Sequence, residues 1–165
     1  MALRVSAIIC VTSFLLGLLF THWTADSLTL WKQPVTDAHL WTAASYYNTL
    51  TKISPYTASF VSAVVVLGAA ALLWSLRDGE AVNLMFDGAS TFLYGTAIAV
   101  YLYSVIPNLS TNFPALPPHT LADAVPPALR INILELASSN LICSVALTGV
   151  LALQAGRWWT ERAEE

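Results

Sequence analysis

Four stretches of apolar residues fill most of this chain, and each approaches the length of a helix that crosses a lipid bilayer. They cover about residues 5–23, 55–76, 86–106 and 131–153. Because the hydrocarbon core offers no partner to an open backbone polar group, a spanning segment of about 20 residues folds as a helix. Only 10% of the residues are charged, which leaves little for an extramembrane domain. The sequence therefore predicts an all-α membrane protein, a four-transmembrane-helix bundle that forms a single domain over residues 1–165.

The first apolar stretch has two interpretations. Arg4 before an apolar run is typical of a signal peptide. A cleavage site needs small residues at the first and third positions before the cut, and Trp23 before Thr24 and Ala25 spoils the best candidate. We expect a retained helix.

The loop between the first two stretches, about residues 24–54, contains a further predicted helix. Thr36 is a suitable N-cap, and Asp37 is favourable in a first helical turn. Apolar residues then recur at helical spacing, namely Leu40, Ala43, Ala44, Tyr47 and Leu50. With Trp31 and Trp41, this amphipathic helix would lie on the membrane surface or pack over the bundle. The second long loop, about residues 107–130, is rich in proline and should be irregular.

Basic residues indicate the orientation of the four spans. Both termini and the short loop after the second span share one side, which carries Arg4, Arg77, Arg157 and Arg162, while the other side carries Lys32, Lys52 and Arg130. The side with more basic residues in short segments faces the cytosol. We therefore expect cytosolic termini and place the predicted amphipathic helix in the lumen.

The fourth apolar stretch carries a carboxylate, Glu135. Asn132, Ser138 and Ser139 lie three or four positions from it, so the four residues share one side of a helix, and Asn140 follows directly. One interpretation is a polar surface offered to another membrane protein, or a proton site. The other is an internal hydrogen-bonded network near the lumenal interface, with His22 or Tyr103 as a partner of Glu135. Placing a charged side chain at the middle of a membrane-spanning helix costs roughly 2.5–3.5 kcal/mol, so under either interpretation we expect Glu135 to have a specific role.

Small residues four positions apart predict close helix approach. Three such pairs occur in the spans, namely Ser59 with Ala63, Gly95 with Ala99, and Ser144 with Thr148. We expect most of them to hold the bundle together, although one pair would equally receive a helix from a client. Asp87, at the start of the third span, is expected to complement the helix dipole and to remain near water.

Several classes of function have no support in the sequence. Cys10 and Cys143 lie inside apolar stretches, and no metal-binding spacing, phosphate loop, dinucleotide motif or paired catalytic carboxylate occurs. The sequence contains no run of basic residues that would bind the phosphates of a nucleic acid. We expect a protein that is not an enzyme and needs no metal or cofactor. The glycosylation sequon at Asn108 follows the third span so closely that we expect it to be unoccupied.

The ordered motifs of the chain resemble the fungal SHR-type packaging chaperones of the endoplasmic reticulum. The resemblance rests on the segments Ser13-Phe-Leu-Leu-Gly17-Leu-Leu-Phe20, His39, Tyr46-Tyr47-x-x-Leu50 with Pro55, Met85-Phe86-Asp87, Ala137-Ser138-Ser139-Asn140, Gly149-Val150 and Leu153-Gln154-x-Gly156-x-Trp158. They occur in order along nearly the whole chain.

This resemblance implies a multi-pass protein of the endoplasmic reticulum membrane that binds newly inserted amino-acid permeases. Such chaperones prevent aggregation of the permease spans and help present the folded client to vesicle-coat components. Only six residues follow Trp159, which favours the folding role over coat recruitment. The client-binding residues would be Asn132, Glu135, Ser138, Ser139 and Asn140. The alternatives are a small transporter or channel, with Glu135 and Asp87 as ion sites, and a structural subunit of a larger membrane complex.

Overall fold

The computed structural model describes residues 2–78 and 81–163, and helices make up most of these two ranges. The helices are α1 (Ala2–Leu30), α2 (Asp37–Leu50), α3 (Pro55–Ser75) with a short 3-10 turn η1 (Leu76–Asp78), α4 (Ala81–Val100), the π-helical segment η2 (Tyr101–Val105), α5 (Ile106–Asn112) and α6 (Pro127–Ala163). The described residues contain no strand. Four helical segments are long and apolar enough to cross a membrane, namely Arg4–Leu30, Pro55–Ser75, Leu84–Asn112 and Pro127–Thr160. The predicted all-α membrane fold with four spanning helices is confirmed.

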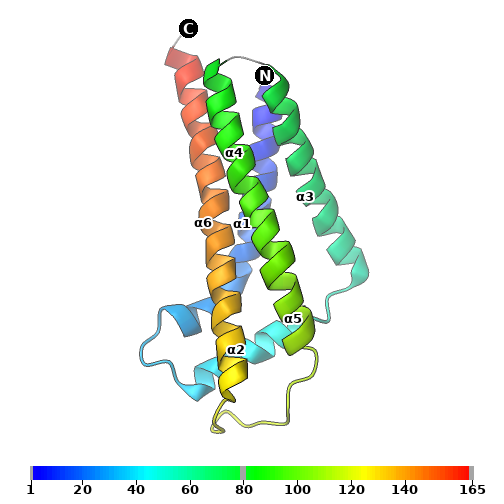
Figure 1. The fold of residues 1–165 in the computed structure, drawn as a ribbon, viewed down its shortest axis with the longest axis vertical. Helices are drawn as coiled ribbons and strands as arrows, with labels where there is room; N and C mark the ends of the chain where they lie inside the picture. The colour runs from blue at the N-terminus through cyan, green and yellow to red at the C-terminus, as the bar shows by residue number, and fades with distance from the viewer. Residues whose placement is uncertain (1, 79–80, 164–165) are drawn as a thin grey trace.

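The four long helices run lengthwise beside one another, with the N-terminus and the C-terminus at the same end of the molecule (Figure 1). We call this the terminal end. Helices α2 and α5 and the loop 113–126 lie at the opposite end, called here the α2 end (Figure 1).

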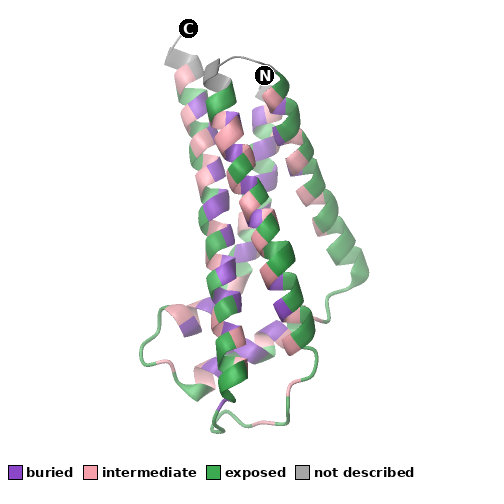
Figure 2. Cartoon of the chain, viewed as in Figure 1, coloured by how far each residue is buried: buried purple, intermediate pink, exposed green. Residues whose placement is uncertain are grey.

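Helix α6 is the centre of the bundle, and α3 is its most peripheral member. In the most apolar part of each span, 44% of the α6 residues are buried but only 11% of the α3 residues. The buried positions of α6 alternate with exposed ones along its length (Figure 2). Helices α1 and α4 both pack on α6, whereas α3 packs on α1 and α4. The first residues of α3, 55–60, are all exposed.

The apolar core is divided into two clusters along the bundle. One joins the spanning helices and includes Ile8, Leu72, Tyr94 and Val150. The other joins α2 to the ends of α1 and α6 and to the loop 113–126, and it consists of Ala25, Leu40, Trp41, Ala43, Ala44, Tyr47, Val105, Phe113, Val125, Ile133 and Leu136. The second cluster gives the α2 end a packed interior of its own.

Helix α2 forms as the sequence predicts and packs over the end of the bundle. Thr36 is its N-cap, accepting a hydrogen bond from the His39 backbone N–H at 3.3 Å, and Asp37 lies in the first turn. Its predicted apolar face is buried in the second cluster together with Trp41, except that Leu50 is only partly buried against the cluster. Trp31, in contrast, is exposed. The open choice between the membrane surface and the bundle is thus settled in favour of the bundle.

The third spanning segment continues past Pro107, where the sequence predicts an end. Proline lacks a backbone N–H and its ring crowds the carbonyl one turn earlier. The π-helical turns of Tyr101–Val105 precede Pro107, which lies in the first turn of α5. The wider π-helical turn accommodates the proline ring without ending the helix, so this span reaches Asn112.

Glycines outside the predicted small-residue pairs leave room for side chains of neighbouring helices. A Cβ atom on Gly68 would lie 2.7 Å from Val11 Cγ1, and one on Gly149 would lie 2.7 Å from Leu93 Cδ1. The predicted pairs face elsewhere: Ser59, Ala63, Gly95, Ala99 and Thr148 are exposed, and Ser144 lines a pocket. Spacing tells which residues share a side of a helix but not which side points inward.

Candidate functional site

The polar residues predicted for client binding lie on two different sides of α6. Glu135 and Ser138 are exposed, whereas Ser139 and Asn140 are buried. Consecutive helical residues are about 100° apart, so the boundary between the outer and inner sides passes between Ser138 and Ser139. The bundle thus divides these residues into an outer pair, Glu135 and Ser138, and an inner pair, Ser139 and Asn140.

Glu135 is hydrogen-bonded to neither of the two partners that the sequence suggests for it, His22 and Tyr103. His22 Nδ1 is hydrogen-bonded to the Tyr46 hydroxyl at 2.9 Å, and Tyr103 is 84% exposed. Among the described residues, Glu135 forms neither a hydrogen bond nor a salt bridge. Its carboxylate is therefore presented at the surface of α6.

The inner pair joins α6 to its neighbours through hydrogen bonds. Ser139 Oγ lies 2.8 Å from Ser104 Oγ on η2. Asn140 Nδ2 donates to the two carboxylate oxygens of Asp26 on α1, at 3.2 and 3.4 Å. These two residues match the alternative interpretation of an internal network.

Asn132 is half-buried near the start of α6 and contributes its backbone. Its carbonyl accepts a hydrogen bond from Asn108 Nδ2 at 3.1 Å. Asn108 is itself buried at 7% exposure, so the sequon nitrogen is engaged inside the fold.

Asp26 is the centre of a buried polar cluster that the sequence analysis did not identify. It is 5% exposed, and it accepts hydrogen bonds from Asn140 and from the hydroxyl of Tyr47 on α2. Burial first, and then the charge of Asp26, raises the pKa of Tyr47 above its usual range, so this hydroxyl remains protonated and donates. The signal was available in the sequence, because Asp26 continues the helical spacing of Leu19 and Trp23 beyond the expected end of the first span.

A second buried cluster surrounds Asp87 near the terminal end. Arg157 Nη1 donates to Asp87 Oδ2 at 2.6 Å and to Ser75 Oγ at 2.8 Å. Gln154 Nε2 donates to Asp87 Oδ1 at 3.2 Å and to Ser90 Oγ at 3.0 Å. Asp87 has no exposed surface, so the prediction that it remains near water is wrong. The cluster connects α3, α4 and α6 through polar side chains.

The two buried carboxylates differ in their electrostatic compensation. Asp87 has the guanidinium of Arg157, whereas in residues 2–78 and 81–163 no Lys, Arg or His forms a salt bridge with Asp26. Both donors to Asp26 are neutral groups. A desolvated carboxylate without a cation is the less favourable of the two arrangements.

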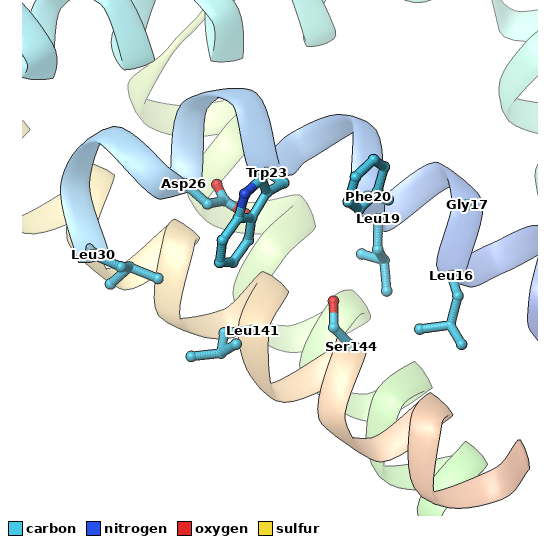
Figure 3. Close-up of a pocket in the computed structure, with 9 residues that line it drawn as sticks. All are labelled: Leu16, Gly17, Leu19, Phe20, Trp23, Asp26, Leu30, Leu141 and Ser144. Atoms are coloured by element: carbon cyan, nitrogen blue, oxygen red, sulfur yellow. The ribbon is translucent and has the colours of Figure 1, made fainter. Parts of the chain in front are cut away.

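An open pocket lies between α1 and α6 and reaches Asp26. Its volume is about 520 Å³, and its lining residues are Leu16, Gly17, Leu19, Phe20, Trp23, Asp26, Leu30, Leu141 and Ser144. Figure 3 shows Asp26 and Trp23 together near one end, with Ser144 of α6 on the side of Leu16 and Leu19. Most lining residues are apolar, and the polar groups among the lining side chains belong to Asp26, Ser144 and the indole of Trp23. The described residues contain no group of three or more His, Cys, Asp or Glu able to hold a metal ion.

Comparison with protein families relates the whole chain to one group. Neither the curated proteins nor the solved structures give a significant match. The family model described as ER membrane protein SH3, the SHR3 chaperone family, matches residues 1–165. The chain therefore belongs to the SHR3 family of endoplasmic reticulum membrane chaperones.

Proposed function

We propose that this endoplasmic reticulum membrane chaperone assists the folding and export of polytopic amino-acid permeases. It would prevent their transmembrane segments from aggregating before the permeases are packaged into vesicles. Membership of the SHR3 family supports the chaperone role, and the permease clients follow from the resemblance described above. The client surface would include the outer side of α6, where Glu135 and Ser138 are exposed.

The observation that carries this proposal is the outward position of these two polar residues on a membrane-spanning helix. Lipid chains offer them no hydrogen bond, and the rest of the described chain leaves Glu135 without a partner. A newly inserted permease has the matching deficiency, because its polar and broken segments have no neighbours until its other helices arrive. The outer pair would satisfy such groups for a time.

The strength of these contacts suits a client that must leave. A hydrogen bond between membrane helices contributes about 0.6–2 kcal/mol. Two such bonds favour the bound client by only a few kcal/mol, and the helices of the maturing permease would compete for the same groups. Binding would therefore weaken as the client folds.

We further propose cytosolic termini, with α2 and the loop 113–126 in the lumen. The excess of basic residues on the terminal side supports this orientation.

The experiment exchanges the outer pair for leucine in fungal cells that express this chain as their source of the chaperone. Glu135→Leu with Ser138→Leu should retain amino-acid permeases in the endoplasmic reticulum, while a hexose carrier and the plasma-membrane proton pump reach the surface. The matched control is Ile131→Leu with Ile142→Leu, two exposed α6 positions that stay apolar. Equal accumulation of both variants shows that folding is intact. Normal permease delivery by the Glu135 and Ser138 variant would refute the role of this surface.

A further inference from the structure

The pocket between α1 and α6 is shaped to accommodate one face of another membrane helix. Its walls are leucine and aromatic side chains, and its volume of about 520 Å³ suits several side chains that project from one helix. A Cβ atom on Gly17 would meet no atom within 4 Å, so the pocket is open at this position. Gly17 and Ser144 are small residues on its two sides, and such residues permit close helix approach in membranes.

The pocket is lined by one acidic residue, Asp26, and by no basic residue. Asp26 lines the pocket and is 5% exposed. Asn140 is 2% exposed and is not among the lining residues, and it donates its amide N–H groups to this carboxylate from behind the pocket wall. A carboxylate that has no cationic partner is complementary to a group with several N–H donors, such as guanidinium or ammonium.

The depth of Asp26 agrees with a basic residue near the end of a partner's span. Asp26 lies four residues before the end of α1, which is about 6 Å along the helix axis. Long basic side chains in spanning helices are found near the ends, where the charged group can extend along the helix. An arginine or lysine one turn inside the end of a neighbouring span would be at a matching depth.

We propose that this pocket binds a transmembrane helix of a client through an arginine or lysine that pairs with Asp26. The inference rests on the proposed function in one respect only, namely that the occupant is a client. It adds a second contact surface, on the pocket between α1 and α6, and a chemical preference: a basic group in an otherwise apolar helix. Asp87 would not serve this purpose, because Arg157 already neutralises it.

The test uses the full chain in phosphatidylcholine vesicles together with leucine-rich transmembrane peptides. One peptide carries an arginine one turn from its end, a second has leucine there, and a third has glutamate. A photoreactive probe is attached through Ser144→Cys, which lines the pocket, in a Cys10→Ser and Cys143→Ala background. Val145→Cys is the matched control, because the adjacent residue is 64% exposed and does not line the pocket.

We expect the arginine peptide to label position 144 more than the leucine peptide by roughly three- to thirtyfold, and the glutamate peptide to label it least. Position 145 should not discriminate among the peptides. Asp26→Asn should remove the preference for arginine, and Gly17→Phe should reduce all labelling at position 144 by filling the pocket. Equal labelling by the arginine and leucine peptides, or a preference that survives Asp26→Asn, would overturn the proposal.

The peptide test and the permease test fail independently. If permeases need the chaperone but the arginine peptide shows no preference at position 144, the pocket proposal is wrong and the proposed function stands. If the arginine peptide binds as expected but permeases are delivered normally without the chaperone, the permease function is wrong and the basic-helix site stands.

Discussion

Arg157 donates through Nη1 to the Asp87 carboxylate at 2.6 Å, and both side chains are almost fully removed from the surface. Breaking such a pair leaves one desolvated charge without compensation, which costs about 3–5 kcal/mol. We therefore predict that Arg157→Met lowers the unfolding free energy by about that amount. Thermal unfolding in detergent would measure it.

The double variant Arg157→Met with Asp87→Leu separates the charge from the packing. Replacing a buried ion pair by apolar residues is often neutral or stabilising. The double variant should thus recover most of the stability that Arg157→Met loses. If it is less stable than Arg157→Met alone, the ion pair contributes in some other way, such as through Ser75 and Gln154.

Gly68 is one of the contacts that hold the peripheral helix α3 in the bundle. Its missing side chain leaves room for Val11 and Tyr94, and the Tyr94 hydroxyl donates to the Val65 carbonyl at 3.1 Å. Gly68→Val should push α3 away from α1 and α4 and lower the unfolding free energy by about 1–3 kcal/mol, as overpacking does. Gly17→Ala is the matched control, because a Cβ there meets nothing. Equal stability of the two variants in detergent would contradict this account of α3.

Trp41 fixes the loop 113–126 over α2. Its ring stacks on His119 with centroids 3.9 Å apart, and its Nε1 donates to the Asp123 carbonyl at 3.0 Å. Trp41→Ala removes a side chain that is 2% exposed, which costs about 3–5 kcal/mol. Limited proteolysis should then cut this loop much faster. Trp31→Ala, at a position 60% exposed, should change the cleavage rate little.

The sequence predicts the spanning helices well because the bilayer imposes a simple length and polarity requirement. It also predicts α2 through the cap at Thr36 and the spacing of Leu40 and Tyr47. Apolar periodicity and cap chemistry are local properties, so a single sequence contains them.

The direction in which each polar residue points is not a local property. Whether Ser139 or Ser138 faces inward depends on where α1 and α4 lie around α6, which a single sequence does not specify. The same limit explains Asp87, for which the helix-dipole argument considers one helix and omits Arg157, 70 residues away. Asp26 was missed because the first span was expected to end before it.

Tyr47 and Asp26 provide a prediction that depends on pH. Burial, and then the charge of Asp26, raises the pKa of Tyr47 above the value near 10 of an unfolded tyrosine. The folded protein therefore holds the Tyr47 proton more tightly than the unfolded chain does. The contribution of this hydroxyl to the unfolding free energy is fully present below about pH 10, and it is lost as the pH rises through the higher pKa of the folded state. The unfolding free energy should fall above about pH 10, and Tyr47→Phe should reduce that dependence.

At neutral pH, Tyr47→Phe should lower the unfolding free energy by about 1–3 kcal/mol, because Asp26 stays buried and loses a hydrogen-bond donor. Tyr56→Phe, at a position 86% exposed, is the control that should leave both the neutral stability and the alkaline slope unchanged. Chemical unfolding at pH 7 and pH 11 would measure both effects, and an alkaline slope unaltered by Tyr47→Phe would show that other groups cause it.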